Sequence, residues 1–425
     1  MTKLTRREFG RIVGIGSLGL MAGCTTGASP GKSTRKVAVV GGGFGGATTA
    51  KYLRMMDPSI EVTLVEPNST YYTCPFSNLV VGGVKGMPAI AHDYKTLQSK
   101  YEVNFVRARA YQVKSNAVVL EDGTKVPFDR AVVSPGVDIR YDKMPGHSQS
   151  IEKKMPHSWK AGPQTMHLRR QLEAMANGGT VIICPPGNPY RCPPGPYERA
   201  SMIAHYLKNN KSNSKIIILD QKEKFSKQPL FTDGWDMHYG DMIEWRSASA
   251  GGKITEIDAN GMRLNTEFGW EEGDVINYIP AQYAGAVARK SGLADASGWC
   301  PVNQTTFEST LVPNVHVIGD ACMAGKMPKS GFSANSQGKE TAAAVVSLLN
   351  GEDPVSPSFV NTCYSYVTPD YSISVAAVYR LKDDSIVGVE GAGGVSPKDA
   401  GEIVRKTEAT YAQGWYDSIT YDMFG

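Results

Sequence analysis

A glycine-rich turn near the start of the chain constrains its fold more than any other feature. A short buried strand, a G-x-G-x-x-G turn, a helical stretch and a second strand follow one another over residues 36–65. The glycines of the turn are Gly41, Gly43 and Gly46, and Glu66 follows the last of them by twenty residues. In such a βαβ unit the glycines permit a tight turn, the helix N-terminus offers free N–H groups to a pyrophosphate, and the acidic residue accepts from ribose hydroxyls. We therefore expect a dinucleotide site here rather than an ordinary glycine-rich turn.

Two further strand ends indicate which dinucleotide is bound. Val132–Gly136 closes one predicted strand and Val315–Asp320 closes another, an arrangement found in flavoproteins with two dinucleotide folds. In those proteins the aspartate of the second motif binds the ribityl chain of FAD, so Asp320 is our candidate for that contact. A helix cap or turn aspartate is the alternative interpretation.

The middle of the chain has the outline of a second nucleotide-binding half without its glycines. Residues 180–183 read as a strand, and a helix near 199–208 and a strand at 215–219 follow. Where a glycine fingerprint is expected, Cys184–Pro189 supplies three prolines, and proline lacks the N–H donor that a pyrophosphate needs. A pyridine nucleotide is therefore a disfavoured ligand, and the electrons must come from another donor.

Length and charge bound the remaining possibilities. A chain of 425 residues exceeds what one hydrophobic core supports, so two or three domains are expected. The formal net charge is +4, and four basic residues and one acidic residue within the first 23 positions supply most of it. The rest of the chain is close to neutral, which argues against nucleic acid as a partner because phosphate binding needs a basic field.

The N-terminus has the layout of an export signal. Arg6 and Arg7 precede a mildly apolar run, 12–22, that is too short to span a bilayer, as in a twin-arginine signal over residues 1–28. A chance basic pair is the plain alternative. The residues before Cys24 resemble a lipoprotein cleavage site, with cleavage a few residues later as the other option. We expect a periplasmic protein whose membrane attachment, if any, is a lipid at Cys24, because no second segment approaches eighteen consecutive apolar residues.

Seven cysteines in an exported chain are compatible with disulfides. Cys192 lies in a proline-rich loop that would hold its thiol at a fixed place ahead of a helix, and Cys363 lies near the start of an aromatic and polar third unit. The residues alone do not pair them, because an inert disulfide, a buried thiol and a pairing of Cys184 with Cys192 all stay open. Cys300 and Cys322 bracket one strand and are candidates for a structural disulfide.

From about Lys36 to Gly425 the chain resembles the flavoprotein subunit of flavocytochrome c sulfide dehydrogenase. The stretches that carry the resemblance most specifically are Tyr71–Pro75, Arg191–Ala200, Met327–Gly331, Ser333–Gly338 and Asn361–Tyr364. With the element pattern above, it implies an α/β fold of two Rossmann-like dinucleotide-binding domains, as in glutathione-reductase-like flavoproteins, plus a smaller C-terminal α+β domain. The expected limits are 35–150 with 275–352 for the FAD-binding domain, 151–274 for the second Rossmann-like domain, and 353–425 for an interface and active-site cover.

The resemblance also implies particular site residues. Cys74 would be joined through its sulfur to the flavin 8α-methyl, and Cys192 and Cys363 would form a redox-active disulfide beside the isoalloxazine, with Glu198 and Trp415 close by. A covalent flavin cannot be lost from an exported protein, and such attachment tends to raise its reduction potential. Glu198 would move protons on and off sulfur, although a glutamate favoured there by the helix dipole is an equal alternative.

Further expectations concern the electrons. Lys329 is a candidate for stabilising negative charge on the reduced flavin, with a solvated loop charge as the alternative. Hydrosulfide would open the cysteine pair, leaving a persulfide on one cysteine and a thiolate on the other, with Cys363 as the expected thiolate, and FAD would take the electrons. The sequence has no C-x-x-C-H haem attachment site and no cysteine-rich iron–sulfur run. The acceptor is therefore another polypeptide, and the resemblance points to a c-type cytochrome subunit carrying haem c.

Two other functions fit the same residues. A sulfide:quinone oxidoreductase shares this logic but meets the membrane through an apolar or amphipathic C-terminal region, and residues 409–425 lack a basic amphipathic stripe. An accessory flavoprotein that reactivates a thiosulfate-oxidising complex would use identical site residues, so the sequence does not separate it from the enzyme.

Overall fold

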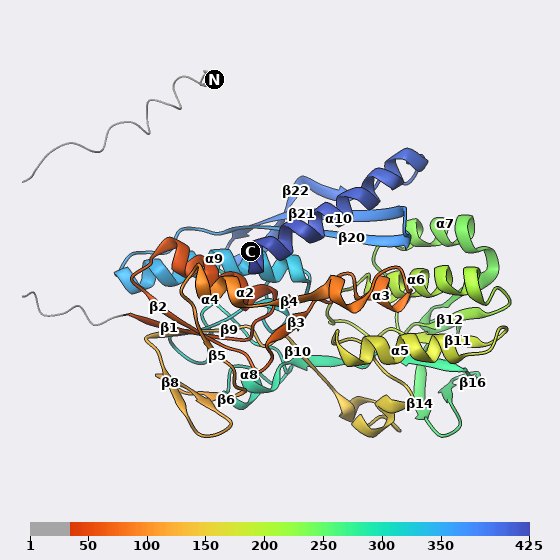
Figure 1. Cartoon of the computed structure of the whole chain (residues 1–425), viewed down its shortest axis with the longest axis horizontal. Coiled ribbons are helices and arrows are strands. Elements are labelled where there is room, and N and C mark those ends of the chain that lie inside the picture. Colours follow the sequence, from red (N-terminus) through yellow and green to blue (C-terminus); the bar gives the residue numbers. More distant parts are fainter. Residues whose placement is uncertain (1–34) are drawn as a thin grey trace, which may run out of the picture. The chain divides into compact units, whose positions relative to one another are not determined.

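The computed structural model describes residues 35–425, so the predicted export signal and Cys24 lie outside the described residues (Figure 1). Its first sheet has five parallel strands in the order β19-β9-β1-β2-β5. The central strand β1 is almost entirely buried, as expected for a parallel sheet covered on both faces, and this explains its continuous apolar run. The strands are β1 (Lys36–Val40), β2 (Glu61–Val65), β5 (Asn104–Val106), β9 (Arg130–Val133) and β19 (Val315–Val317).

Two helices of this first part cross at very close range. They are α2 (Phe44–Met56) and α9 (Gly331–Asn350). A Cβ at Gly338 would lie 2.8 Å from the carbonyl oxygen of Gly45, so glycine is required where the two backbones meet. The shorter elements around them are β3 (Thr70–Tyr72), α3 (Ser77–Val81), β4 (Ala91–Asp93), α4 (Lys95–Ser99), β6 (Ala110–Val113), β7 (Ala117–Leu120), β8 (Lys125–Pro127), β10 (Val137–Ile139), β18 (Gln282–Ala284) and α8 (Ala286–Lys290).

A second parallel sheet forms the middle of the chain, with the strand order β13-β12-β11-β17. Its strands are β11 (Thr180–Cys184), β12 (Lys215–Leu219), β13 (Ile243–Arg246) and β17 (Val275–Tyr278), and its helices are α5 (Pro163–Ala174), α6 (Gly195–Asn210) and α7 (Gln228–Tyr239). A separate antiparallel sheet contains β14 (Ile254–Asp258), β15 (Arg263–Thr266) and β16 (Gly269–Glu272). The predicted start of the returning FAD-binding segment at residue 275 was wrong, because β17 pairs with β11 and so belongs to the second sheet.

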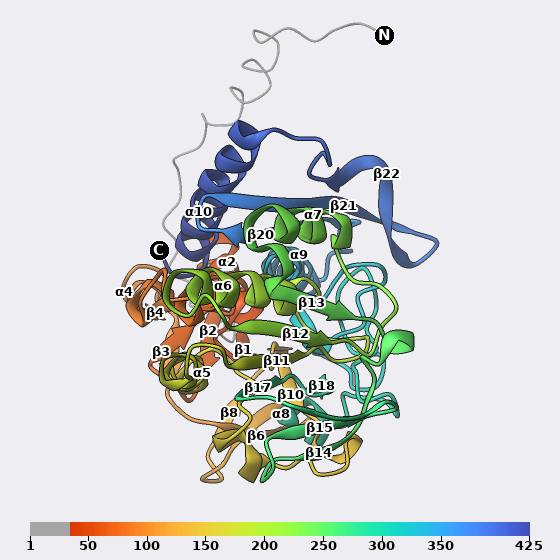
Figure 2. The ribbon, with the colours of Figure 1, turned by 90° about the vertical axis from the view of Figure 1, so that its right-hand side faces the viewer.

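The C-terminal part is an antiparallel meander with one long helix. Its elements are β20 (Ser358–Thr368), β21 (Tyr371–Lys382), β22 (Ser385–Val395) and α10 (Glu402–Phe424). Figure 2 shows this sheet and α10 along one side of the described chain, and β20 packs on both α6 and α9. Lys51 of α2 donates to the carbonyl oxygens of Asp422 (3.0 Å) and Gly425 (2.8 Å), a favourable place for a cation at a helix C-terminus.

Two parallel sheets followed by a C-terminal sheet with a helix agree with the predicted α/β class. Within residues 35–425, no helix combines the length and the apolar character that crossing a bilayer requires.

Candidate active site

Three cysteines from distant parts of the sequence line one small cavity. Cys74 lies between β3 and α3, Cys192 lies in the loop before α6, and Cys363 lies on β20. Glu198 and Trp415 line the same cavity, whose volume is about 40 Å³. This volume exceeds the room that one water molecule needs, so a small sulfur species fits beside the thiols. The fold therefore brings together five of the residues that the resemblance singled out.

The backbone around Cys192 is strained and tightly held. Cys192 has φ +60°, in the left-handed region that side-chain-bearing residues rarely adopt. Its N–H donates to the carbonyl oxygen of Lys329 (2.8 Å), and its own carbonyl accepts from the N–H of Gly195 (2.9 Å). A Cβ at Gly195 would lie 2.9 Å from Cys192 Sγ and 2.8 Å from Trp159 Cη2. Strain of this kind clusters at functional sites, and here it fixes the direction of one thiol.

The three thiols differ in how readily they lose a proton. The neighbouring Cys192 thiol, with the guanidinium groups of Arg191 and Arg199, lowers the pKa of Cys74 to about 7 against the opposing effect of burial. The pKa of Cys192 is raised in turn, first by Cys74 and then by burial. Burial also raises the pKa of Cys363. Cys74 is therefore the sulfur that ionises most readily near neutral pH.

Glu198 is held at the cavity by residues from two other elements. One carboxylate oxygen accepts from Asn78 Nδ2 of α3 (2.7 Å), and the other accepts from the backbone N–H of Tyr366 on β20 (3.0 Å). Burial raises its pKa, while these hydrogen bonds and the nearby Lys227 and Arg199 oppose the rise. Glu198 does lie in the first turn of α6, but its partners aim it into the cavity. A carboxyl group with a raised pKa beside a thiol is suited to proton transfer.

Arg199 is a buried cation that the sequence interpretation did not identify. Its side chain donates to Asn78 Oδ1 (3.0 Å), Asn277 Oδ1 (2.9 Å) and the carbonyl oxygens of His157 (3.0 Å) and Ser158 (2.7 Å). Burial lowers its pKa to about 10, so the group stays protonated near neutral pH. The only local signal was its position directly after Glu198.

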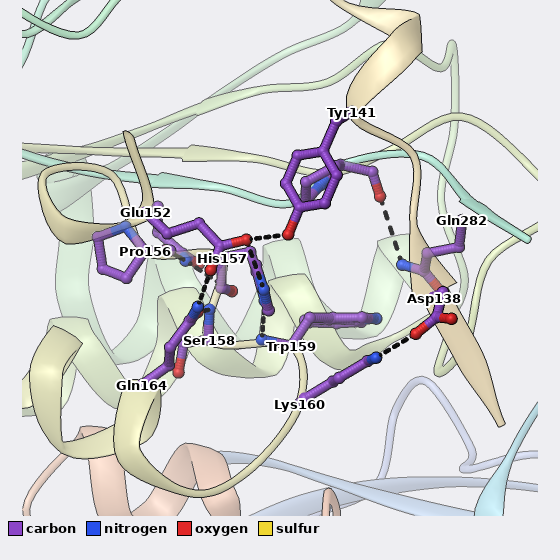
Figure 3. A network of polar contacts seen from close by, with 12 residues as sticks. Asp138, Tyr141, Glu152, Pro156, His157, Ser158, Trp159, Lys160, Gln164 and Gln282 are labelled. Atoms are coloured by element: carbon purple, nitrogen blue, oxygen red, sulfur yellow. Dashed lines mark hydrogen bonds and ion pairs between the residues drawn. The ribbon is translucent and has the colours of Figure 1, made fainter. Parts of the chain in front are cut away.

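A second network holds the backbone of Trp159, whose ring lines the cavity (Figure 3). The backbone N–H of Trp159 donates to His157 Nδ1 (2.8 Å), and His157 Nε2 lies 3.4 Å from Glu152 Oε1. Gln164 donates to the same carboxylate (2.6 Å). Because burial lowers the pKa of His157, the imidazole is neutral and can accept from Trp159 at one nitrogen while donating to Glu152 at the other.

The glycine turn has the geometry that a dinucleotide requires. Gly41 has φ +96°, and a Cβ there would lie 2.3 Å from the carbonyl oxygen of Ser134. A Cβ at Gly46 would lie 1.8 Å from the carbonyl oxygen of Gly41. Glu66 accepts from the N–H groups of Gly42 (2.9 Å) and Asn68 (2.9 Å), which holds its carboxylate beside the turn.

The second motif glycine and four buried polar atoms test whether these residues fit a flavin. Gly43 caps the N-terminus of α2, whose first-turn N–H groups can receive a phosphate. The buried polar atoms without a hydrogen-bond partner in the described chain include Asp320 Oδ1, Arg191 Nε, Trp159 Nε1 and Trp415 Nε1. Both tryptophans line the cysteine cavity, and Arg191 acts electrostatically on Asp320 and Cys74. Buried polar atoms are normally paired, so a large polar cofactor explains this cluster, and the residues present fit FAD.

Lys329 is partly buried and carries defined contacts. Its Nζ donates to the carbonyl oxygens of Asp320 (2.8 Å) and Cys322 (2.8 Å) and lies 3.9 Å from the ring centroid of Trp299. A freely solvated loop charge, the alternative interpretation, does not describe this geometry. Its predicted action on a reduced flavin stays a prediction.

None of the six cysteines between residues 35 and 425 is in a disulfide in the structure, and the redox-active pairing of Cys192 with Cys363 stays a prediction. Cys300 and Cys322 are neighbours in a parallel bridge, and both are buried thiols. The open alternative of a Cys184 to Cys192 pair is disfavoured. Cys184 points into the core on one face of β11, whereas Cys192 packs against the cluster on the other face.

Comparison with known proteins identifies the family. Family models match residues 165–280 (sulfide dehydrogenase [flavocytochrome c] flavoprotein chain, central) and residues 355–424 (flavocytochrome c sulphide dehydrogenase, flavin-binding). The flavoprotein chain of sulfide dehydrogenase from Chlorobaculum thiosulfatiphilum is 72% identical over 47 residues, which are 11% of this chain and 98% of that sequence. The chain belongs to the flavocytochrome c sulfide dehydrogenase flavoprotein family. As a member of this family it is a flavoprotein oxidoreductase, which confirms the predicted class.

Wider relatives share the fold of this flavoprotein family. A pyridine nucleotide-disulphide oxidoreductase model matches residues 35–174. The mitochondrial sulfide:quinone oxidoreductase of Dictyostelium discoideum is 23% identical over 331 residues, covering 74% of this chain and 69% of that protein. Among solved structures, the sulfide:quinone oxidoreductase of Aquifex aeolicus has a TM-score of 0.69 at 14% identity and covers 91% of this chain and 92% of its own. At such identities the structural likeness supports the fold alone, and it confirms the predicted glutathione-reductase-like arrangement.

Proposed function

We propose that this flavoprotein oxidises hydrosulfide at the Cys192 and Cys363 pair and passes the electrons through FAD to a c-type cytochrome subunit that carries haem c. One observation carries the proposal, namely that Cys192 and Cys363 line a single cavity with Glu198 and Cys74 although they are distant in the sequence. The family assignment supports sulfide as the substrate, because the sulfide dehydrogenase and the sulfide:quinone oxidoreductases that the chain resembles are both named for sulfide.

The chemistry proceeds from the oxidised pair. Hydrosulfide attacks one sulfur of the Cys192–Cys363 disulfide, the S–S bond breaks, and a new S–S bond joins the substrate sulfur to the attacked cysteine. The electron pair of the broken bond leaves with the other cysteine as a thiolate. FAD, when bound, supplies the two-electron acceptor for this centre. Glu198 holds or releases the proton of the persulfide, for which its raised pKa is suited.

We infer that Cys74 anchors the flavin covalently through its sulfur. With a pKa of about 7, roughly half of the Cys74 thiol is ionised near neutral pH, so Cys74 would offer a sulfur nucleophile to the 8α-methyl carbon, and the isoalloxazine would take up the two electrons released when the C–S bond replaces a C–H bond. Cys74 also borders the cavity of the redox pair, so an anchor there keeps the flavin beside the reacting sulfurs. Purified protein precipitated with acid should retain flavin in the pellet, and a Cys74→Ser variant should release it to the supernatant.

The compartment belongs to the same proposal. The Arg6-Arg7 pair and the apolar run behind it support twin-arginine export to the periplasm, where a c-type cytochrome partner is available, with lipid attachment at Cys24 as an added option. Replacing both arginines by lysine should leave the protein in the cytoplasmic fraction. Recovery of that variant in the periplasm would contradict this route.

The decisive experiment is a sulfide titration of the purified protein while flavin absorbance is recorded. Cys192→Ser and Cys363→Ser should each abolish flavin bleaching, because a single sulfur cannot form the disulfide. Cys184→Ala is the matched control, since it removes a buried thiol that does not line the cavity and should leave bleaching intact. Undiminished bleaching in both serine variants would overturn the proposal.

Quinone reduction is the second candidate, supported by the similarity to sulfide:quinone oxidoreductases over 74% of the chain. The same preparation separates the two functions. Sulfide-dependent reduction of cytochrome c, with little reduction of a soluble quinone, is expected, and the reverse ratio would favour the quinone enzyme.

A further inference from the structure

A buried lysine that has no evident structural reason lies behind the cysteine cavity. Lys227 is 7% exposed and directly precedes α7 with φ +60°. A cation at a helix N-terminus opposes the helix dipole, and burying an amine carries a further desolvation cost. Two unfavourable features at one residue call for a compensating charge or a function.

The ammonium group of Lys227 points away from its own helix toward the third domain. Its Nζ donates to Ser365 Oγ on β20 (2.8 Å) and to the carbonyl oxygen of Ile373 on β21 (3.4 Å). Ser365 lies two residues after Cys363 on the same strand, so both side chains lie on the same face. Both residues line the cysteine cavity.

The donor pattern orients the serine hydroxyl. An ammonium group only donates, so Ser365 Oγ accepts from Lys227 and keeps its own proton free to donate elsewhere. Lys227 and Ser365 both lower the pKa of Cys363 against the larger effect of burial, and Cys363 Sγ itself donates to the carbonyl oxygen of Tyr364 (3.6 Å). Lys227 thus reaches Ser365 through a hydrogen bond, and Ser365 lines the same cavity as Cys363.

We propose that Lys227 and Ser365 stabilise negative charge on the Cys363 sulfur, and thereby direct hydrosulfide to Cys192 and make Cys363 the leaving thiolate. The inference rests on the proposed function. Hydrosulfide forms a bond to Cys192 Sγ, the Cys192–Cys363 bond breaks, and its electron pair goes to Cys363 Sγ. One negative charge enters with hydrosulfide and one remains on Cys363, while the substrate's proton stays on the persulfide at Cys192.

The other charges around Cys363 make this assistance necessary. Glu198 from α6 raises the pKa of Cys363, and the Cys74 thiol from the loop before α3 does so only in protein that lacks the proposed bond to the flavin. Glu408 of α10 also faces Lys227, and its carboxylate accepts from Arg405 (3.1 Å) and Ser374 (2.9 Å).

Lys227 favours one sulfur of the pair over the other. Burial lowers the pKa of Lys227. Three nearby groups raise it again, and their effects decrease in the order Cys363, Glu198, Cys192. The lysine therefore interacts more strongly with Cys363 than with Cys192. The sulfur with the lower pKa leaves faster in thiol–disulfide exchange, so cleavage toward Cys363 is favoured.

The test measures the reactivity of Cys363 in the reduced holoprotein, independently of turnover. The rate of iodoacetamide alkylation at Cys363 and at Cys192 is followed against pH by peptide mass spectrometry. Removing a neighbouring opposite charge shifts a pKa by about 1–2 units. Lys227→Met should therefore raise the pKa of Cys363 and slow its alkylation near neutral pH by about 10-fold or more. Ser365→Ala should give a smaller shift in the same direction, and Ser365→Thr, which keeps the hydroxyl, should restore the wild-type profile.

Lys211→Met is the matched control. Lys211 is also buried, donates only to main-chain carbonyls, those of Glu173 (2.7 Å) and Met175, and does not line the cysteine cavity. It should lower stability without moving the Cys363 profile. An unchanged Cys363 profile in folded Lys227→Met and Ser365→Ala proteins would overturn the inference.

A second measurement locates the substrate sulfur. Oxidised protein is treated with one equivalent of sulfide, the persulfide is trapped with a blocking reagent, and the labelled peptide is identified. The label is expected on Cys192 in the wild type and should be divided between both cysteines in Lys227→Met. A label on Cys363 in the wild type, or a Cys192 label unaffected by Lys227→Met, refutes the assignment while the proposed function stands. Absence of any persulfide refutes the proposed function itself.

Discussion

Gly195→Ala tests whether the position of one sulfur limits the reaction. The added Cβ would lie 2.9 Å from Cys192 Sγ and 2.8 Å from Trp159 Cη2. Carbon contacts are normally about 3.5–4.0 Å long, so the sulfur or the ring must move by about 0.6 Å or more. Misplacement on the order of 1 Å costs about 100-fold in rate, and we expect sulfide oxidation to fall by roughly that factor.

Stability should change far less than activity in this variant. Gly195 begins α6 with an ordinary backbone conformation, so alanine gains about 1 kcal/mol in helix propensity. Overpacking of the cavity wall costs about 1–3 kcal/mol, which leaves a net loss of about 0–2 kcal/mol in the free energy of unfolding.

The assay is stopped-flow bleaching of the flavin by sulfide, paired with urea unfolding. Gly187→Ala is the control, because Gly187 lies in the same proline-rich loop and a Cβ there meets nothing within 4 Å. A Gly195→Ala protein that oxidises sulfide as fast as Gly187→Ala would refute the argument that Cys192 must sit where the structure has it.

Three further predictions concern buried polar groups. Arg199→Met leaves four buried hydrogen-bond acceptors without their donor. It should lower the free energy of unfolding by at least about 3 kcal/mol in urea titrations, and a loss under about 1 kcal/mol would contradict this. Burial between the rings of Tyr141 and Tyr278 lowers the pKa of His147 to about 4. The neutral imidazole therefore contributes to the free energy of unfolding above its unfolded pKa of about 6.5, and this contribution is lost as the pH falls from about 6.5 toward 4. Thermal unfolding of His147→Phe should therefore depend less on acid than that of the wild type. Burial raises the pKa of Asp320, because the buried carboxylate is unfavourable in the protein without flavin. Asp320→Asn should therefore stabilise the flavin-free protein at neutral pH. The same variant, purified as expressed, should contain less flavin than the wild type, measured from its visible absorbance.

Local patterns were sufficient for parts of the fold and the site. The tight turn at Gly41 and the close approach at Gly46 are properties of consecutive residues, and both follow from the glycine spacing alone. The failure at residue 275 has a physical reason, because a short apolar strand such as β17 carries no mark of which sheet it joins. The disfavoured Cys184 pairing was in principle readable, since alternation along β11 already turns Cys184 away from the loop that follows.

The sequence by itself determined that a dinucleotide fold is present, that a proline-rich loop replaces the second glycine fingerprint, and, through resemblance, which family to expect. These are short-range properties of backbone freedom and hydrogen-bond donors. Only the tertiary structure decided what surrounds Cys363. Lys227 and Ser365 become its neighbours because β20 packs across α6 and α7, and no local pattern marks a lysine at a helix start as the buried countercharge of a sulfur on a strand more than a hundred residues away.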